Sequence, residues 1–90
     1  MAWRLEVPPH VAEVVRHLPP DVKLAVKAAL RGLVLQPEMG ELLQGDLEGL
    51  RKFRARRYRI VYRVDRRSRT IRIFAVGHRR GVYEEAAAAR

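Results

Sequence analysis

The side chains best suited to chemistry lie near the C-terminus, where a Gly-His-Arg-Arg run occupies positions 77–80 and Tyr83 follows. Cleaving RNA without a metal requires a group that takes the proton of the attacking 2′-hydroxyl, a cation for the phosphorane and an acid for the leaving oxygen. Arginine supplies only the cation, because it does not titrate in this range. The candidates for proton transfer are therefore His78, Tyr83, Glu41 and Lys52.

Positive charge is concentrated in the same half of the chain. The 90 residues carry 19 Lys and Arg against 10 Asp and Glu, a formal net charge of +9 and a pI near 11.2. Thirteen of these cations lie in residues 51–80, where Asp65 is the only acid. Such an excess indicates a polyanionic partner, with nucleic acid first. An acidic protein partner and a surface that serves only solubility remain open.

The basic half also has the alternation of β-strands, which places it on a folded platform. Apolar residues alternate with cations near 52–56, 58–64 and 71–76, with short turns between, which predicts three antiparallel strands in a meander. One face would bury Phe53, Ile60, Tyr62, Ile71 and Ile73. The other would display Lys52, Arg54, Arg59, Arg63 and Arg72, with Phe74 and Tyr83 available to stack on bases.

The N-terminal half supplies the elements that must support this sheet. Trp3, Leu5 and Val7 have the spacing of a short strand, and two proline pairs bound helices over about 9–18 and 20–34. Residues 36–49 are predicted to be a loop, and residues 81–90 a short, weakly held helix. We predict one α+β domain over residues 1–90, an antiparallel meander packed on a helical hairpin in the order β-α-α-β-β-β. The second face of the sheet would be free.

Several other classes of function are poorly served. There is no cysteine, no paired-histidine spacing and no Gly-rich phosphate loop, so we expect neither a metal nor a cofactor. The first residues lack the apolar core of a signal peptide, and no apolar run approaches the length of a membrane span. We therefore expect a cytoplasmic protein that does not enter a membrane.

Two segments resemble the RelE/ParE toxin superfamily of prokaryotic toxin–antitoxin systems. They are LEGLRKFRARRYRIVYRVD at 47–65 and IRIFAVGHRRGVY at 71–83, and the upstream elements agree in order and length. In its RelE branch the resemblance implies an endoribonuclease that enters the ribosomal A site and cleaves messenger RNA. The nucleophile is the messenger's own 2′-hydroxyl, and no metal takes part.

The resemblance also implies roles for residues of this chain. Matching positions assign catalysis to Arg59, Arg79 and Tyr83, with His78 beside them and Glu41 at the place of a glutamate that some relatives use. RNA binding is assigned to Lys52, Arg54, Arg56, Arg63 and Arg72.

Partners follow from the same resemblance. It implies a cognate antitoxin that covers the basic face or displaces the C-terminal helix, together with the ribosome and messenger RNA. Operator DNA would be bound only through the antitoxin complex. Two alternatives stay open: a ParE-like inhibitor of DNA gyrase that is not an enzyme, and an inactive RelE-like binding module.

Overall fold

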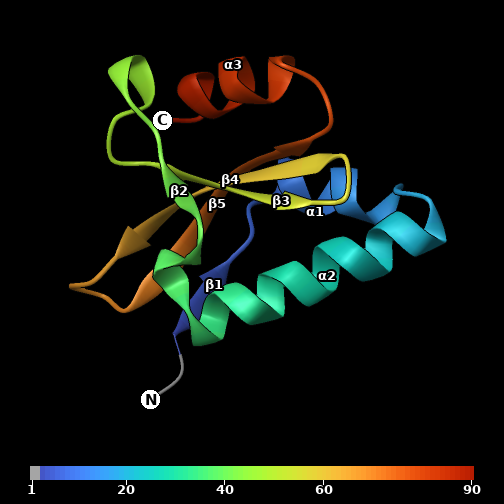
Figure 1. Ribbon diagram of the computed structural model, residues 1–90, viewed down its shortest axis with the longest axis horizontal. Helices are drawn as coiled ribbons and strands as arrows, with labels where there is room; N and C mark the ends of the chain where they lie inside the picture. Colours follow the sequence, from blue (N-terminus) through green and yellow to red (C-terminus); the bar gives the residue numbers. More distant parts are fainter. Residues whose placement is uncertain (1–2) are drawn as a thin grey trace.

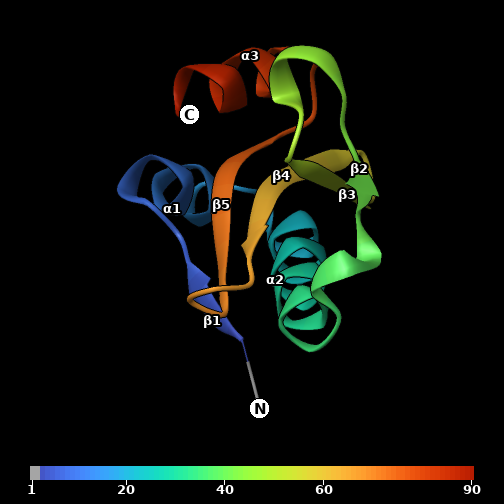
Figure 2. The same ribbon diagram turned by 90° about the vertical axis from the view of Figure 1, so that its left-hand side faces the viewer.

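A five-stranded sheet lies between two helical layers in the computed structural model, which describes residues 3–90 (Figures 1 and 2). The α+β fold class is confirmed. Along the sheet the strands run in the order β1-β5-β4-β3-β2, and β1 pairs in parallel with β5 while all other pairs are antiparallel. The strands are β1 Arg4–Glu6, β2 Glu41–Leu42, β3 Arg51–Ala55, β4 Tyr58–Asp65 and β5 Thr70–Gly77.

The helical hairpin covers one face of this sheet. It comprises α1, Pro9–Arg16, and α2, Pro20–Leu35, and each helix begins at a proline, whose fixed φ suits a first turn. Figure 1 shows α2 running along the lower side of the sheet. The main core lies between these layers and includes Val26, Leu33, Ile60 and Tyr62, all with no exposed surface.

The opposite face of the sheet is not free, contrary to the prediction. The C-terminal helix α3, Gly81–Ala88, packs there, above the sheet in Figure 1, and buries Val82 and Ala86. These residues join Leu50, Val61 and Ala75 in a second apolar cluster. The side chain of Arg90 donates hydrogen bonds to the carbonyl oxygens of Asp46 and Glu48 at 2.9 and 2.5 Å. The prediction of a weakly held tail underestimated these contacts.

A β-bulge in β5 changes which side chains face which layer. Val61 pairs with Ala75 but Tyr62 pairs with Ile73, so Phe74 is an extra residue. Val76 therefore joins the main core, whereas Phe74 and Ala75 both lie in the second cluster. Phe74 is 7% exposed, so the predicted availability of its ring for base stacking is wrong.

The segment between α2 and β3 contains more structure than the predicted loop. Two 3₁₀ turns, Pro37–Met39 and Gly45–Leu47, flank the short edge strand β2. Gly40 precedes β2 in a space that no side chain could share, because a Cβ there would lie 2.4 Å from the Tyr62 hydroxyl. None of the helices in residues 3–90 has the length and apolarity needed to cross a membrane.

Candidate functional site

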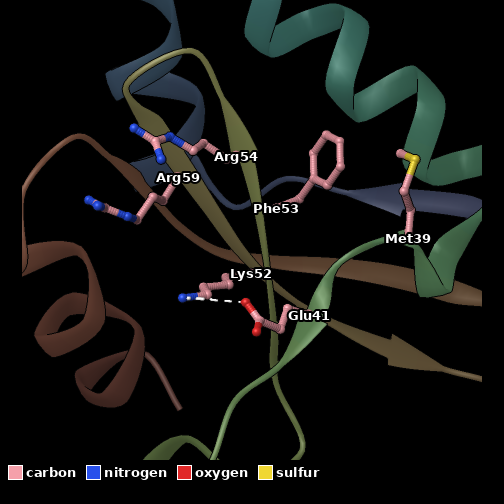
Figure 3. Close-up of a pocket in the computed structure, with 6 residues that line it drawn as sticks. All are labelled: Met39, Glu41, Lys52, Phe53, Arg54 and Arg59. Carbon is pink, nitrogen blue, oxygen red and sulfur yellow. Dashed lines mark ion pairs between the residues drawn. The ribbon is translucent and has the colours of Figure 1, made fainter.

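A pocket of about 350 Å³ opens where β2 begins beside β3. It is lined by Met39, Glu41, Lys52, Phe53, Arg54 and Arg59. The register explains the grouping: Glu41 lies opposite Lys52 across β2 and β3, and Arg54 lies opposite Arg59 across β3 and β4. In Figure 3, Lys52 and Arg59 extend toward the α3 side, and Phe53 and Met39 lie on the α2 side.

The pocket holds three cations and one carboxylate. Glu41 Oε1 lies 3.6 Å from Lys52 Nζ, and Glu41 is the more exposed of the two side chains, at 75% against 38%. Arg54 and Arg59 face each other directly across two strands, an arrangement of like charges that destabilises a sheet. A bound anion would relieve this repulsion. The site is therefore suited to a phosphate group, and Glu41 supplies a proton acceptor beside it.

The position of Glu41 is fixed by the buried hydroxyl of Tyr62. This hydroxyl accepts a hydrogen bond from the Gly40 backbone N–H at 2.8 Å and donates one to the Pro37 carbonyl oxygen at 2.7 Å. Arg51 Nη1 donates to the Gly40 carbonyl oxygen at 2.7 Å. Burial raises the pKa of Tyr62, which outweighs the lowering effects of the Gly40 hydrogen bond and of the Arg51 charge. The turn that leads into Glu41 is thus held from the β3 and β4 strands.

None of the C-terminal candidates lines this pocket. Gly77 pairs with Arg59 at the end of β5, Arg79 follows two residues later, and Tyr83 lies in the first turn of α3. The Tyr83 ring is half-buried against the second cluster, on the face that carries Lys52 and Arg59.

His78 is placed differently. Its ring stacks on Tyr58, with ring centroids 5.1 Å apart and an angle of 27° between the planes. Tyr58 packs against the main core, on the face of the sheet opposite to Arg59. The structure therefore turns His78 away from the pocket.

The remaining predicted RNA-binding residues are spread over other parts of the surface. Arg63 and Arg72 pair across β4 and β5 beyond the bulge, and Arg72 Nε contacts Glu6 Oε1 at 2.6 Å. Arg56 lies in the β3–β4 turn with a φ of 58° and forms a 3.4 Å ion pair with Asp21. The basic surface is thus interrupted by α3 and is not one continuous row.

Sequence reasoning missed two residues that line the pocket. Phe53 was assigned only to the core, and Met39 lies in a segment predicted to be a loop without a role. Their only signal in the sequence is proximity to Glu41 and Lys52. Across residues 3–90, no group of three or more His, Asp or Glu side chains is placed to hold a metal ion.

The chain is similar to known proteins in both sequence and fold. Residues 4–83 match the family described as "ParE toxin of type II toxin-antitoxin system, parDE". A search of curated protein sequences gave no match.

Solved structures similar to this chain are toxins of such systems. The RelBE2 toxin–antitoxin complex from Mycobacterium tuberculosis matches with a TM-score of 0.80 and 27% identity, covering 88% of this chain and 100% of that chain. A mutant of the E. coli toxin RelE in the free state matches with a TM-score of 0.81 and 26% identity, covering 98% and 97%. The same mutant in complex with an antitoxin RelBc peptide matches with a TM-score of 0.74 and 26% identity, covering 96% and 95%.

Proposed function

The chain belongs to the ParE toxin family of type II toxin–antitoxin systems, and we propose that this toxin is a ribosome-dependent endoribonuclease that cleaves messenger RNA without a metal. The observation that carries the proposal is the pocket in which Arg54 opposes Arg59 beside the Glu41–Lys52 ion pair. A protein that only needed a stable sheet would gain nothing from two arginines placed opposite each other. A reaction that builds negative charge on a phosphate gains directly from them.

The proposed reaction is attack by a 2′-hydroxyl oxygen on the adjacent phosphorus, with loss of the 5′ oxygen. The products are a 2′,3′-cyclic phosphate and a 5′-hydroxyl end. Glu41 is the carboxylate that lines the pocket, so it is the candidate acceptor of the 2′-hydroxyl proton. Tyr83, on the adjacent helix turn, is the candidate donor to the leaving oxygen.

The cations divide between positioning and transition-state stabilisation. Arg59 and Arg79 would stabilise the phosphorane, whose negative charge exceeds that of the substrate phosphate. Lys52 and Arg54, on the neighbouring strand, would hold the RNA backbone in register.

A cognate antitoxin is the proposed protein partner. The comparison structures include complexes of RelE-type toxins with RelB antitoxin or an antitoxin peptide. The net charge of +9 favours a partner segment with acidic residues. Operator DNA would be reached only through that complex, and the ribosome requirement places the active toxin in the cytoplasm.

The test compares wild type with Arg59→Gln on ribosomes that hold a defined codon in the A site. We expect cleavage by the variant to fall about 100-fold or more, as for loss of one transition-state donor. Arg31→Gln is the matched control, because Arg31 is exposed on α2, far from the pocket in sequence and on the other layer. Equal cleavage by wild type and Arg59→Gln would refute the assignment of this pocket.

A second candidate function follows from the matched family description itself, which names ParE. A ParE-like toxin would inhibit DNA gyrase by binding, without cleaving RNA. A supercoiling assay with purified gyrase separates the two: inhibition by wild type, with no messenger cleavage on ribosomes, would favour the gyrase target. Inactivity in both assays would leave an inactive binding module.

A further inference from the structure

The Tyr58–His78 pair is an aromatic stack that the proposed reaction does not use. The last ladder pair between β4 and β5 joins Arg59 to Gly77, and the same register carried one residue further brings Tyr58 opposite His78. The two rings are nearly parallel, at 27°, with centroids 5.1 Å apart. Tyr58 is half-buried and His78 is exposed. The tyrosine therefore supports a histidine ring that remains accessible to solvent.

The surroundings of this stack are cationic and concave. Tyr58 lines a second pocket of about 430 Å³ together with Asp21, Val22, Arg56 and Arg57. Arg56 is engaged by Asp21 at 3.4 Å, whereas Arg57 is exposed at the turn. Arg57 therefore lies beside the stack, whereas the side chain of Arg59 lies on the opposite face of the sheet.

We propose that the Tyr58–His78 stack is a nucleobase-binding site for single-stranded RNA, an inference that rests on the proposed action on RNA. Aromatic and imidazole rings bind unstacked bases by stacking, and nearby cations hold the flanking phosphates. The stack lies at the end of β4 and β5 beside the exposed Arg57, so the phosphate that flanks the bound base would meet Arg57 and not the pocket on the α3 side.

The placement separates this role from proton transfer. His78 lies on the side of the sheet where Tyr58 meets the main core, whereas Lys52, Arg54 and Arg59 lie on the α3 side. The imidazole therefore orients the RNA strand and does not act on the scissile phosphate. We therefore expect an aromatic ring without an ionisable group, such as that of phenylalanine, to bind the base in place of the imidazole.

The experiment measures binding of a short single-stranded RNA that contains 2-aminopurine, whose fluorescence falls when the base stacks. Purified full-length toxin is used without ribosomes. We expect His78→Ala to weaken binding about tenfold and to remove the quenching, the usual size of effect for loss of one stacking ring. His78→Phe should keep both within about twofold. His17→Ala, which removes the exposed histidine that caps the C-terminal end of α1, is the matched control and should bind as wild type does.

The outcomes distinguish this inference from the proposed function. Equal binding and quenching by wild type and His78→Ala would overturn the proposed stacking site. Equal loss of binding in His78→Phe and His78→Ala would overturn it as well. If wild type quenches the probe through His78 but cleaves no messenger on ribosomes, the stacking site stands and the nuclease proposal fails. If wild type cleaves messenger and its cleavage is unchanged in His78→Ala, with no quenching, the nuclease proposal stands and the stacking site fails.

Discussion

Replacing Tyr62 by phenylalanine tests how the fold holds the turn that carries Glu41. The change removes one hydroxyl from a side chain with no exposed surface. The Gly40 N–H and the Pro37 carbonyl oxygen then lose the partner that now binds them at 2.8 and 2.7 Å. A buried group left without a partner costs about 1–3 kcal/mol, and the carbonyl of Pro37 is less buried than the amide of Gly40. We expect Tyr62→Phe to lose about 2–3 kcal/mol of the free energy of unfolding.

Urea denaturation measures this loss. A urea m-value of about 1–3 kcal/mol/M converts the expected loss into a fall of about 0.7–3 M in the midpoint, with the slope unchanged. Tyr58→Phe is the matched control, because no hydrogen bond of the Tyr58 hydroxyl is found within residues 3–90. A loss below about 0.5 kcal/mol, no larger than for an ordinary surface change, would refute the reasoning.

The same variant should change the alkaline limb of the stability curve. Burial raises the pKa of Tyr62 above its ordinary value of 10.0, so the unfolded chain releases this proton first. Its contribution is therefore complete below pH 10 and is lost as pH rises through the folded-state pKa. The free energy of unfolding of wild type should fall more steeply above pH 10 than that of Tyr62→Phe, and parallel curves would contradict the assignment.

Three further predictions concern other parts of the fold. Ala86→Glu places a charge in the buried interface between α3 and the sheet, so the α3 amides should lose hydrogen-exchange protection. Ala87→Glu, on the exposed side of α3, should leave that protection unchanged. Gly40→Ala should cost about 1–3 kcal/mol in urea denaturation because its Cβ has no room, whereas Gly81→Ala, with open space around it, should be neutral or stabilising. The pKa of Asp65 is lowered below its ordinary 3.8, chiefly by the hydrogen bond from the Ser68 backbone N–H. The Asp65 carboxylate therefore stabilises the fold above that pH, and this stabilisation is lost as pH falls through the folded-state pKa. The free energy of unfolding of Asp65→Asn should depend less on pH in the acid range than that of wild type.

Each of these has an outcome that would contradict it. Protection of the α3 amides in the Ala86→Glu variant would mean that the helix is held mainly by its Arg90 contacts. Equal stability of the two alanine substitutions would mean that the turn before β2 yields freely to an added methyl group. An acid limb unchanged in Asp65→Asn would show that the turn carboxylate does not contribute.

Local sequence pattern was sufficient to predict the two helices of the hairpin, β1 and the three strands of the meander, and the face on which the cations lie. The period of two in a strand puts Arg59 and Arg63 on one face of β4 and Ile60 and Tyr62 on the other, and the structure confirms this. Proline pairs set the helix ends for an equally local reason, since proline suits a first turn and cannot continue a helix.

The predictions from sequence failed where the structure of one segment depends on contacts with a segment far away in the chain. The bulge at Phe74 is a property of two strands pairing, and no alternation within β5 alone reveals it. The strand β2 exists because residues 41 and 42 lie against β3. Likewise α3 is held by cluster residues from β4 and β5 and by Arg90 contacts with Asp46 and Glu48, which lie more than forty positions away.

The sequence by itself determined that this chain has a basic sheet face, because side-chain direction in a strand is fixed by local geometry. Only the tertiary structure decided how that face is divided. Docking of α3 separates Arg63 and Arg72 from the pocket that Lys52, Arg54 and Arg59 line. The Tyr62 hydroxyl, 22 positions from Gly40 in the chain, holds the turn before Glu41 in place. Continuing the β4–β5 register turns His78 onto Tyr58 and away from the pocket. These outcomes depend on contacts between segments far apart in the chain, which local periodicity does not encode.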